Sequence, residues 1–150
     1  MGGYSAMALV LCMLMSARSF LSQPLDRNDF VELQRTGCLG SCPVYTVRIF
    51  ADGRVVWLGK SAVKVRGDAT SHVALAEASK LIEKFIASGF WDLPDQHGRS
   101  SVDGPSSITT LHVGKREKRF PDNPGTSPIW VELLGLKVDS LANTKQWTGR

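Results

Sequence analysis

The stretch "RTGCLGSCPVYTVRIFADGRVVWLG", Arg35–Gly59, contains two strand patterns separated by a turn signal. In residues 44–50 apolar and polar side chains alternate, which is typical of a strand with one buried face. Asp52-Gly53 supplies residue types that tolerate positive φ, so we predict a two-residue hairpin turn there before the β-rich residues 54–59. The side chains expected to share the buried face of the first strand are Tyr45, Val47 and Ile49.

The rest of the chain adds four strand patterns and two helix patterns. We predict these strands at residues 30–36, 62–67, 107–113 and 116–120. A helix is predicted where apolar residues recur at i, i+3, i+4 and i+7, with Thr70 or Ser71 as its cap and Gly89 at its end. Its apolar face comprises Ala78, Leu81, Ile82 and Phe85.

A second helix is predicted to be capped by Ser127, with Pro128 in its first position. Its apolar stripe comprises Trp130, Leu134, Val138 and Leu141. The predicted order is therefore four strands, a helix, two strands and a helix. Consecutive strands with separate helices indicate the α+β class, an antiparallel sheet of about six strands with two helices packed on one face.

Length and charge set broad limits. A chain of 150 residues suits a single domain with one sizeable core. The formal net charge is +4, and the basic residues are spread along the chain. A diffuse charge of this size does not predict a nucleic-acid partner.

The N-terminus differs from the remainder of the chain. "AMALVLCMLMSA", residues 6–17, is an uncharged apolar run of 12 residues, too short to span a bilayer. We interpret residues 1–19 as a signal peptide, 20–29 as a linker and 30–148 as one α+β domain. No Lys or Arg precedes the run, so the alternatives are a buried or disordered N-terminal segment and a wrongly chosen start codon.

The three cysteines bear on compartment and chemistry. Removing the leader would remove Cys12 and leave an even pair, Cys38 and Cys42, as an oxidising compartment favours. Their spacing is C-x-x-x-C with no helix pattern after it, unlike a C-x-x-C redox motif at a helix N-terminus. We therefore expect a structural disulfide, with free thiols and a metal or redox role as alternatives. No cofactor, metal site or catalytic residue is predicted.

Two polar features remain as candidates for function. Asp103 lies in a loop rich in Gly and Pro, where a carboxylate either bonds to backbone N–H groups or lines a cleft. The basic run "KREKR" is either an anion patch or a charged strand protected against edge-to-edge aggregation. Its cations are Lys115, Arg116, Lys118 and Arg119.

The stretch quoted at the outset resembles the opening of a bacterial family of domains of unknown function, numbered 6438. The similarity extends over about residues 30–148, through "FWDLPD", Asp103 and "ITTLHVGKREKRFPD". The chain departs from the family pattern at Gly104 and in its long basic run after Gly114. The resemblance implies no activity, and family members commonly look exported or lipid-anchored. The motif positions in this chain are Cys38, Gly40, Cys42, Pro43, Tyr45, Asp52, Gly53 and Gly59.

Together these features predict a secreted or periplasmic domain without catalytic chemistry, which binds a small ligand or an envelope protein, or serves as a structural component of the cell envelope. Tyr45 and Asp103 are its candidate cleft residues. One alternative is an enzyme or thiol-redox factor that uses Cys38, Cys42 or Asp103. The other is an anion-binding module that uses residues 115–119.

Overall fold

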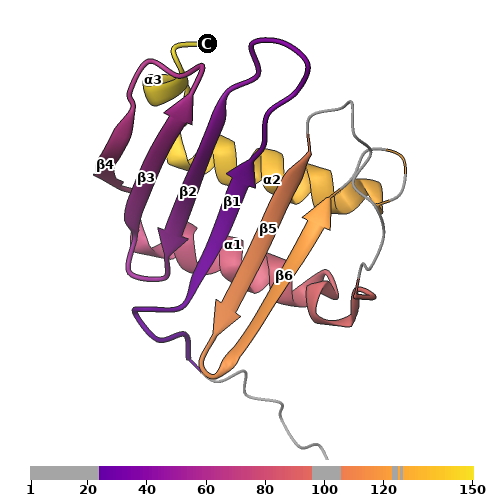
Figure 1. Cartoon of the computed structure of the whole chain (residues 1–150). Helices are drawn as coiled ribbons and strands as arrows, with labels where there is room; N and C mark the ends of the chain where they lie inside the picture. The colour runs from indigo at the N-terminus through magenta and orange to yellow at the C-terminus, as the bar shows by residue number, and fades with distance from the viewer. Residues whose placement is uncertain (1–23, 96–105, 123–124, 126) are drawn as a thin grey trace, which may run out of the picture.

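The computed structural model describes residues 24–95, 106–122, 125 and 127–150. A six-stranded antiparallel sheet has the order β4-β3-β2-β1-β5-β6. Two long helices lie side by side on one face of it (Figure 1), so the predicted α+β class is confirmed. The elements are β1 Phe30–Arg35, β2 Val44–Phe50, β3 Arg54–Ser61, β4 Gly67–His72, α1 Leu75–Ala87, the 3-10 helix η1 Phe90–Asp92, β5 Ser107–Val113, β6 Arg116–Asp122, α2 Ile129–Ala142 and α3 Lys145–Thr148.

The core lies between the sheet and the two long helices. β2 alternates buried and half-buried residues as its sequence predicts, with Tyr45, Val47 and Ile49 facing the helices. α1 buries all four residues of its predicted apolar face, and Gly89 follows its end with φ +79°. The buried face of the sheet, where apolar residues recur with period 2, packs against the buried faces of the helices, where they recur with period 3.6. One continuous core forms between them.

Residues 62–66 do not form the predicted strand, and β4 begins only at Gly67. Their backbone pairs instead with the C-terminal segment: Val65 N–H donates to the Trp147 carbonyl at 2.9 Å. The Trp57 indole N–H donates to the Val65 carbonyl at 3.1 Å. Thr70 and Ser71, the two predicted caps, both belong to β4, and Ala74 precedes α1 without a side-chain cap.

The β2–β3 connection has three residues, 51–53, rather than the predicted two. Gly53 N–H donates to the Phe50 carbonyl at 2.9 Å, and Gly53 has φ +89°. A Cβ on Gly53 would lie 2.4 Å from the Val73 carbonyl oxygen. Both this close contact and the positive φ require glycine at this position.

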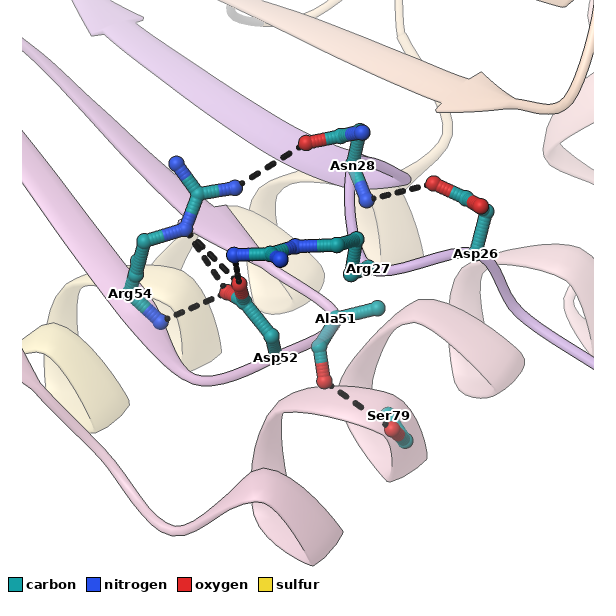
Figure 2. A network of polar contacts seen from close by, with 7 residues as sticks. All are labelled: Asp26, Arg27, Asn28, Ala51, Asp52, Arg54 and Ser79. Atoms are coloured by element: carbon teal, nitrogen blue, oxygen red, sulfur yellow. Dashed lines mark hydrogen bonds and ion pairs between the residues drawn. The ribbon is translucent and has the colours of Figure 1, made fainter.

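A polar network holds this turn against the segment before β1 (Figure 2). Asp52 accepts hydrogen bonds from both the backbone N–H and the Nε of Arg54, and lies 3.5 Å from Arg27. Desolvation acts to raise the pKa of Asp52, but the hydrogen bonds and charge of Arg54 outweigh this effect and lower that pKa below its ordinary value. Arg54 also donates to Asn28, and Ser79 of α1 donates to the Ala51 carbonyl. These bonds connect three elements at one end of the sheet.

α2 begins one residue later than predicted, so Pro128 precedes the helix instead of opening it. Its buried face comprises Val131, Leu134, Gly135, Val138 and Ala142, while the predicted Trp130 and Leu141 are only half-buried. A Cβ on Gly135 would lie 3.4 Å from Leu33 Cδ1, which shows how closely α2 packs on β1. None of the helices in the described part of the chain combines the length and the apolar character needed to cross a membrane.

Candidate functional site

A cleft of about 890 Å³ opens beside α2, at the end of the sheet where β1 finishes and β2 begins. One side is formed by α2 and the other by the β1–β2 connection, and α3 lies at one end. A concave site of this volume lies within the usual range for ligand pockets. Its lining residues are Arg35, Thr36, Cys42, Pro43, Tyr45, Ser106, Glu132, Leu136, Asp139, Ser140, Asn143, Thr144, Lys145, Thr148 and Arg150.

Asp139 is the centre of the cleft's polar wall. The Tyr45 hydroxyl donates to Asp139 Oδ1 at 2.7 Å. Arg35 donates to Asp139 Oδ2 from Nη2 at 2.8 Å and from Nε at 3.2 Å. The Thr144 hydroxyl donates to Oδ1 at 3.3 Å. The carboxylate is therefore held by donors from β1, β2 and the start of α3.

The electrostatics of this wall follow from burial and from Asp139. Burial, and then the nearby Asp139 carboxylate, raise the pKa of Tyr45 well above its ordinary value. Burial acts to lower the pKa of Arg35, but the charge and hydrogen bonds of Asp139 outweigh it, and that pKa is raised. Near neutral pH the wall thus presents a neutral phenol and a guanidinium cation, both hydrogen-bonded to Asp139.

The β1–β2 connection forms the next part of the cleft. Cys38 and Cys42 have disulfide geometry, with their Cα atoms 5.6 Å apart. Cys42 lines the cleft, and the Arg150 guanidinium donates to the neighbouring Ser41 carbonyl at 2.5 Å. Formation of this disulfide in the compartment where the protein works remains a prediction.

Of the two predicted cleft residues, Tyr45 lies in the cleft and Asp103 lies outside the described residues. Tyr45 also stacks on Trp57, with ring centroids 4.6 Å apart, and Trp57 stacks on Trp147 at 5.1 Å. This aromatic stack joins β2, which carries Tyr45, to β3 and to α3.

The basic run is divided between the two faces of the sheet. The register of β6 against β5 places Arg116 and Lys118 on the helix side and Arg119 on the open side. Lys118 Nζ donates to the carbonyls of Trp91 and Leu93. The Arg116 guanidinium lies 4.3 Å from the Trp91 ring centroid. Arg116 and Lys118 thus contact the segment that contains η1. An anion-binding role for the basic run remains a prediction.

Sequence analysis missed Asp139, Arg35 and α3 as parts of the site. One signal was present: Arg35 continues the buried phase of Val31 and Leu33, which places a cation where an apolar residue is expected. A charge on a helix-facing position needs a partner, and Asp139 on α2 supplies it. Within the described residues no cluster of three or more His, Cys, Asp or Glu side chains could hold a metal ion.

The comparisons with known proteins give the family. A family model described as "Domain of unknown function (DUF6438)" matches residues 29–141. The chain belongs to this family. A comparison of this DUF6438 domain with curated proteins finds no match. The cleft therefore has to be interpreted from its own residues.

The residues that suggested the resemblance to this family in the sequence have two different environments. Asp52, Gly53 and Gly59 lie in or beside β3 and maintain close backbone approaches. Cys42 and Tyr45 line the cleft. The first group explains how the domain folds, while the second directs attention to the cleft.

Proposed function

We propose that the DUF6438 domain is an exported, non-catalytic binding domain of the cell envelope whose ligand occupies the cleft beside α2. The observation that carries this proposal is the preassembled wall of the cleft, in which Asp139 is held by Arg35 and Tyr45. Such a wall presents fixed dipoles and charges without reorganisation, which favours binding because little ordering is needed.

The same geometry favours binding over catalysis. Proton transfer needs a group whose pKa lies near the working pH. The Tyr45 pKa is displaced upward, and Arg35 remains protonated. Both side chains are also engaged with Asp139, so neither is poised as a general base or nucleophile.

The thiol-redox alternative keeps one observation in its favour, because Cys42 lines the cleft. Against it, the residues after Cys42 enter β2 rather than a helix, so no helix dipole lowers the pKa of a thiol there. Reduction of a small disulfide substrate by the wild-type chain and by a Cys38→Ala variant separates the two functions, because Cys38 does not line the cleft. A redox factor turns the substrate over and loses this activity in the variant, whereas a binding domain shows no turnover in either.

Export is supported by the apolar run at residues 6–17 and by the cysteine pair that remains after it. N-terminal sequencing of protein isolated from its native host tests it. The expected result is a chain that begins near Ser19 or Phe20 in an extracytoplasmic fraction. An intact Met1 or Gly2 in the cytosol would contradict export.

A fragment screen tests the binding role. We expect small polar fragments to shift the amide NMR signals of cleft residues in a ¹⁵N-labelled chain of residues 20–150. Ser140→Trp, on the exposed lining of α2, should abolish these shifts by filling the cleft. Lys137→Trp is the matched control, since Lys137 is exposed on the same helix but does not line the cleft. Shifts that survive Ser140→Trp would place binding elsewhere.

A further inference from the structure

The cleft is a groove that follows α2. Its lining residues on that helix, from Glu132 to Asn143, recur at helical spacing and so form one face. With a rise of 1.5 Å per residue, this face is about 16 Å long. An extended chain advances about 3.3 Å per residue, so the groove has the length of about five residues of extended peptide.

One exposed stripe of α2 is apolar, and it reaches the groove at Leu136. Ile129, Leu133 and Leu136 lie at i, i+4 and i+7 of α2, and their exposed fractions are 67%, 51% and 49%. Leu136 also lines the groove itself. α2 thus buries one apolar face in the core and exposes a second one, which marks an interaction surface when it borders a polar site.

The charges of the groove differ between its two ends. Lys145 and Arg150 lie at the α3 end, and Glu132 lies near the start of α2. Arg35 adds little net charge to the middle, since Asp139 neutralises it. Across the described residues, Lys145 and Glu132 have no oppositely charged side chain within ion-pair distance. An occupant with an acidic end therefore complements the α3 end.

We propose that the groove binds an extended peptide segment of about five residues that carries an acidic group at one end and aliphatic side chains beside it. The acidic group pairs with Lys145 and Arg150, and the aliphatic side chains cover Leu136 and Leu133. This inference rests on the proposed function, because it names the ligand class of the same cleft.

A peptide fits this surface better than a second copy of the domain does. A stable dimer buries about 800 Å² per partner. Three partly exposed aliphatic side chains cannot supply that area, and a concave groove needs a narrow occupant. A single extended peptide needs only a small contact area and is narrow enough for the groove. Its acidic end supplies an ion-pair partner for Lys145.

Fluorescence polarisation with defined probes tests the proposal. The probe is a fluorescein-labelled peptide with two leucines followed by two aspartates, and its comparison peptide carries two lysines in place of the aspartates. With the disulfide-intact chain of residues 20–150, the acidic probe should bind at least about tenfold more tightly than the basic one. Added salt should reduce the difference in affinity between the acidic and the basic probe, because salt screens their charges.

Three variants connect binding to the named residues. Lys145→Glu should weaken the acidic probe at least about tenfold and strengthen the basic probe, a reversal that a misfolded variant would not show. Leu136→Gln should weaken both probes several-fold. Lys137→Glu is the matched control, a charge reversal outside the groove, and should leave both affinities within about twofold.

Every other outcome counts against the peptide. If fragments shift cleft residues but the two probes bind equally or not at all, the ligand class is wrong while the binding function stands. If neither fragments nor probes bind, both proposals fall. If sedimentation shows a dimer that Leu136→Gln dissociates, a second copy is the occupant and the peptide proposal is overturned.

Discussion

The Tyr45 hydroxyl donates a 2.7 Å hydrogen bond to Asp139 Oδ1, which joins β2 to α2 across 94 residues of sequence. The phenyl ring below it stacks on Trp57 in the core. Tyr45 therefore belongs to the core through its ring and to the cleft through its hydroxyl. The two roles can be separated by a single substitution.

Tyr45→Phe should retain the packing and remove the bond to Asp139. We expect a loss of about 1.5 kcal/mol in the free energy of unfolding, the low end for bonds to charged groups, because the pair is partly exposed. Urea denaturation measures it. In an Asp139→Asn background the same substitution should cost less, since the charged acceptor is gone. Equal losses in both backgrounds would mean that the hydroxyl acts through another partner.

Alkaline pH should reveal the raised pKa of Tyr45 directly, because it is the only tyrosine in residues 20–150. The folded state favours the protonated phenol, so the stabilisation is complete below pH 10, near the ordinary tyrosine pKa. It is lost as pH rises through the higher pKa of the folded state. Tyrosinate absorbance should thus appear only above pH 10 while the chain stays folded. An ordinary midpoint would contradict the buried environment.

The sequence predicted the fold well where side-chain periodicity decides it, and less well where tertiary contacts do. The face of β2 and the buried face of α1 follow from local alternation and helical spacing. Residues 62–66 have strand-like composition, yet their backbone bonds to the C-terminal segment, a contact distant in sequence. The cleft has the same character, since Arg35 and Asp139 are 104 residues apart. The sequence predicted Tyr45 as a cleft residue, and the charge of Arg35 in the buried phase of β1 was a further signal that was missed.

Removing the disulfide between Cys38 and Cys42 should lower the free energy of unfolding only modestly. The closed loop has five residues, for which chain entropy gives about 2 kcal/mol. We expect the double alanine variant to lose about this much stability and to keep its far-ultraviolet circular dichroism. The wild-type protein under reducing conditions is the control, and it should match the variant. Complete unfolding of either would show that the loop directs the whole fold.

Lys118 should behave differently from Lys115, although both belong to the basic run. Lys118 donates to two carbonyls of the segment after α1, whereas Lys115 is exposed in the β5–β6 turn. Lys118→Gln should cost about 1–2 kcal/mol, because hydrogen bonds from a charged donor are lost. Lys115→Gln is the matched control and should be neutral within about 0.5 kcal/mol. Equal effects would contradict a structural role for Lys118.

Gly59 provides the sharpest test of how residues 62–66 pack on the sheet. A Cβ at this position would lie 2.0 Å from the Val65 carbonyl oxygen and 2.9 Å from Trp57 Nε1. The carbonyl cannot move away without losing its bond from the Trp57 indole N–H. We therefore expect Gly59→Ala to lower the free energy of unfolding by about 2–3 kcal/mol, as overpacking does in cores.

The control for Gly59→Ala is Gly37→Ala, where the nearest atom to the added carbon is Val44 Cγ2 at 3.7 Å, an ordinary contact. That variant should change stability by less than about 0.5 kcal/mol. Tryptophan fluorescence should also shift in Gly59→Ala and not in Gly37→Ala, because only the first disturbs the stack of Trp57 on Trp147. If the two alanine variants were equally stable, the 62–66 segment could not lie against Gly59 as the structure places it.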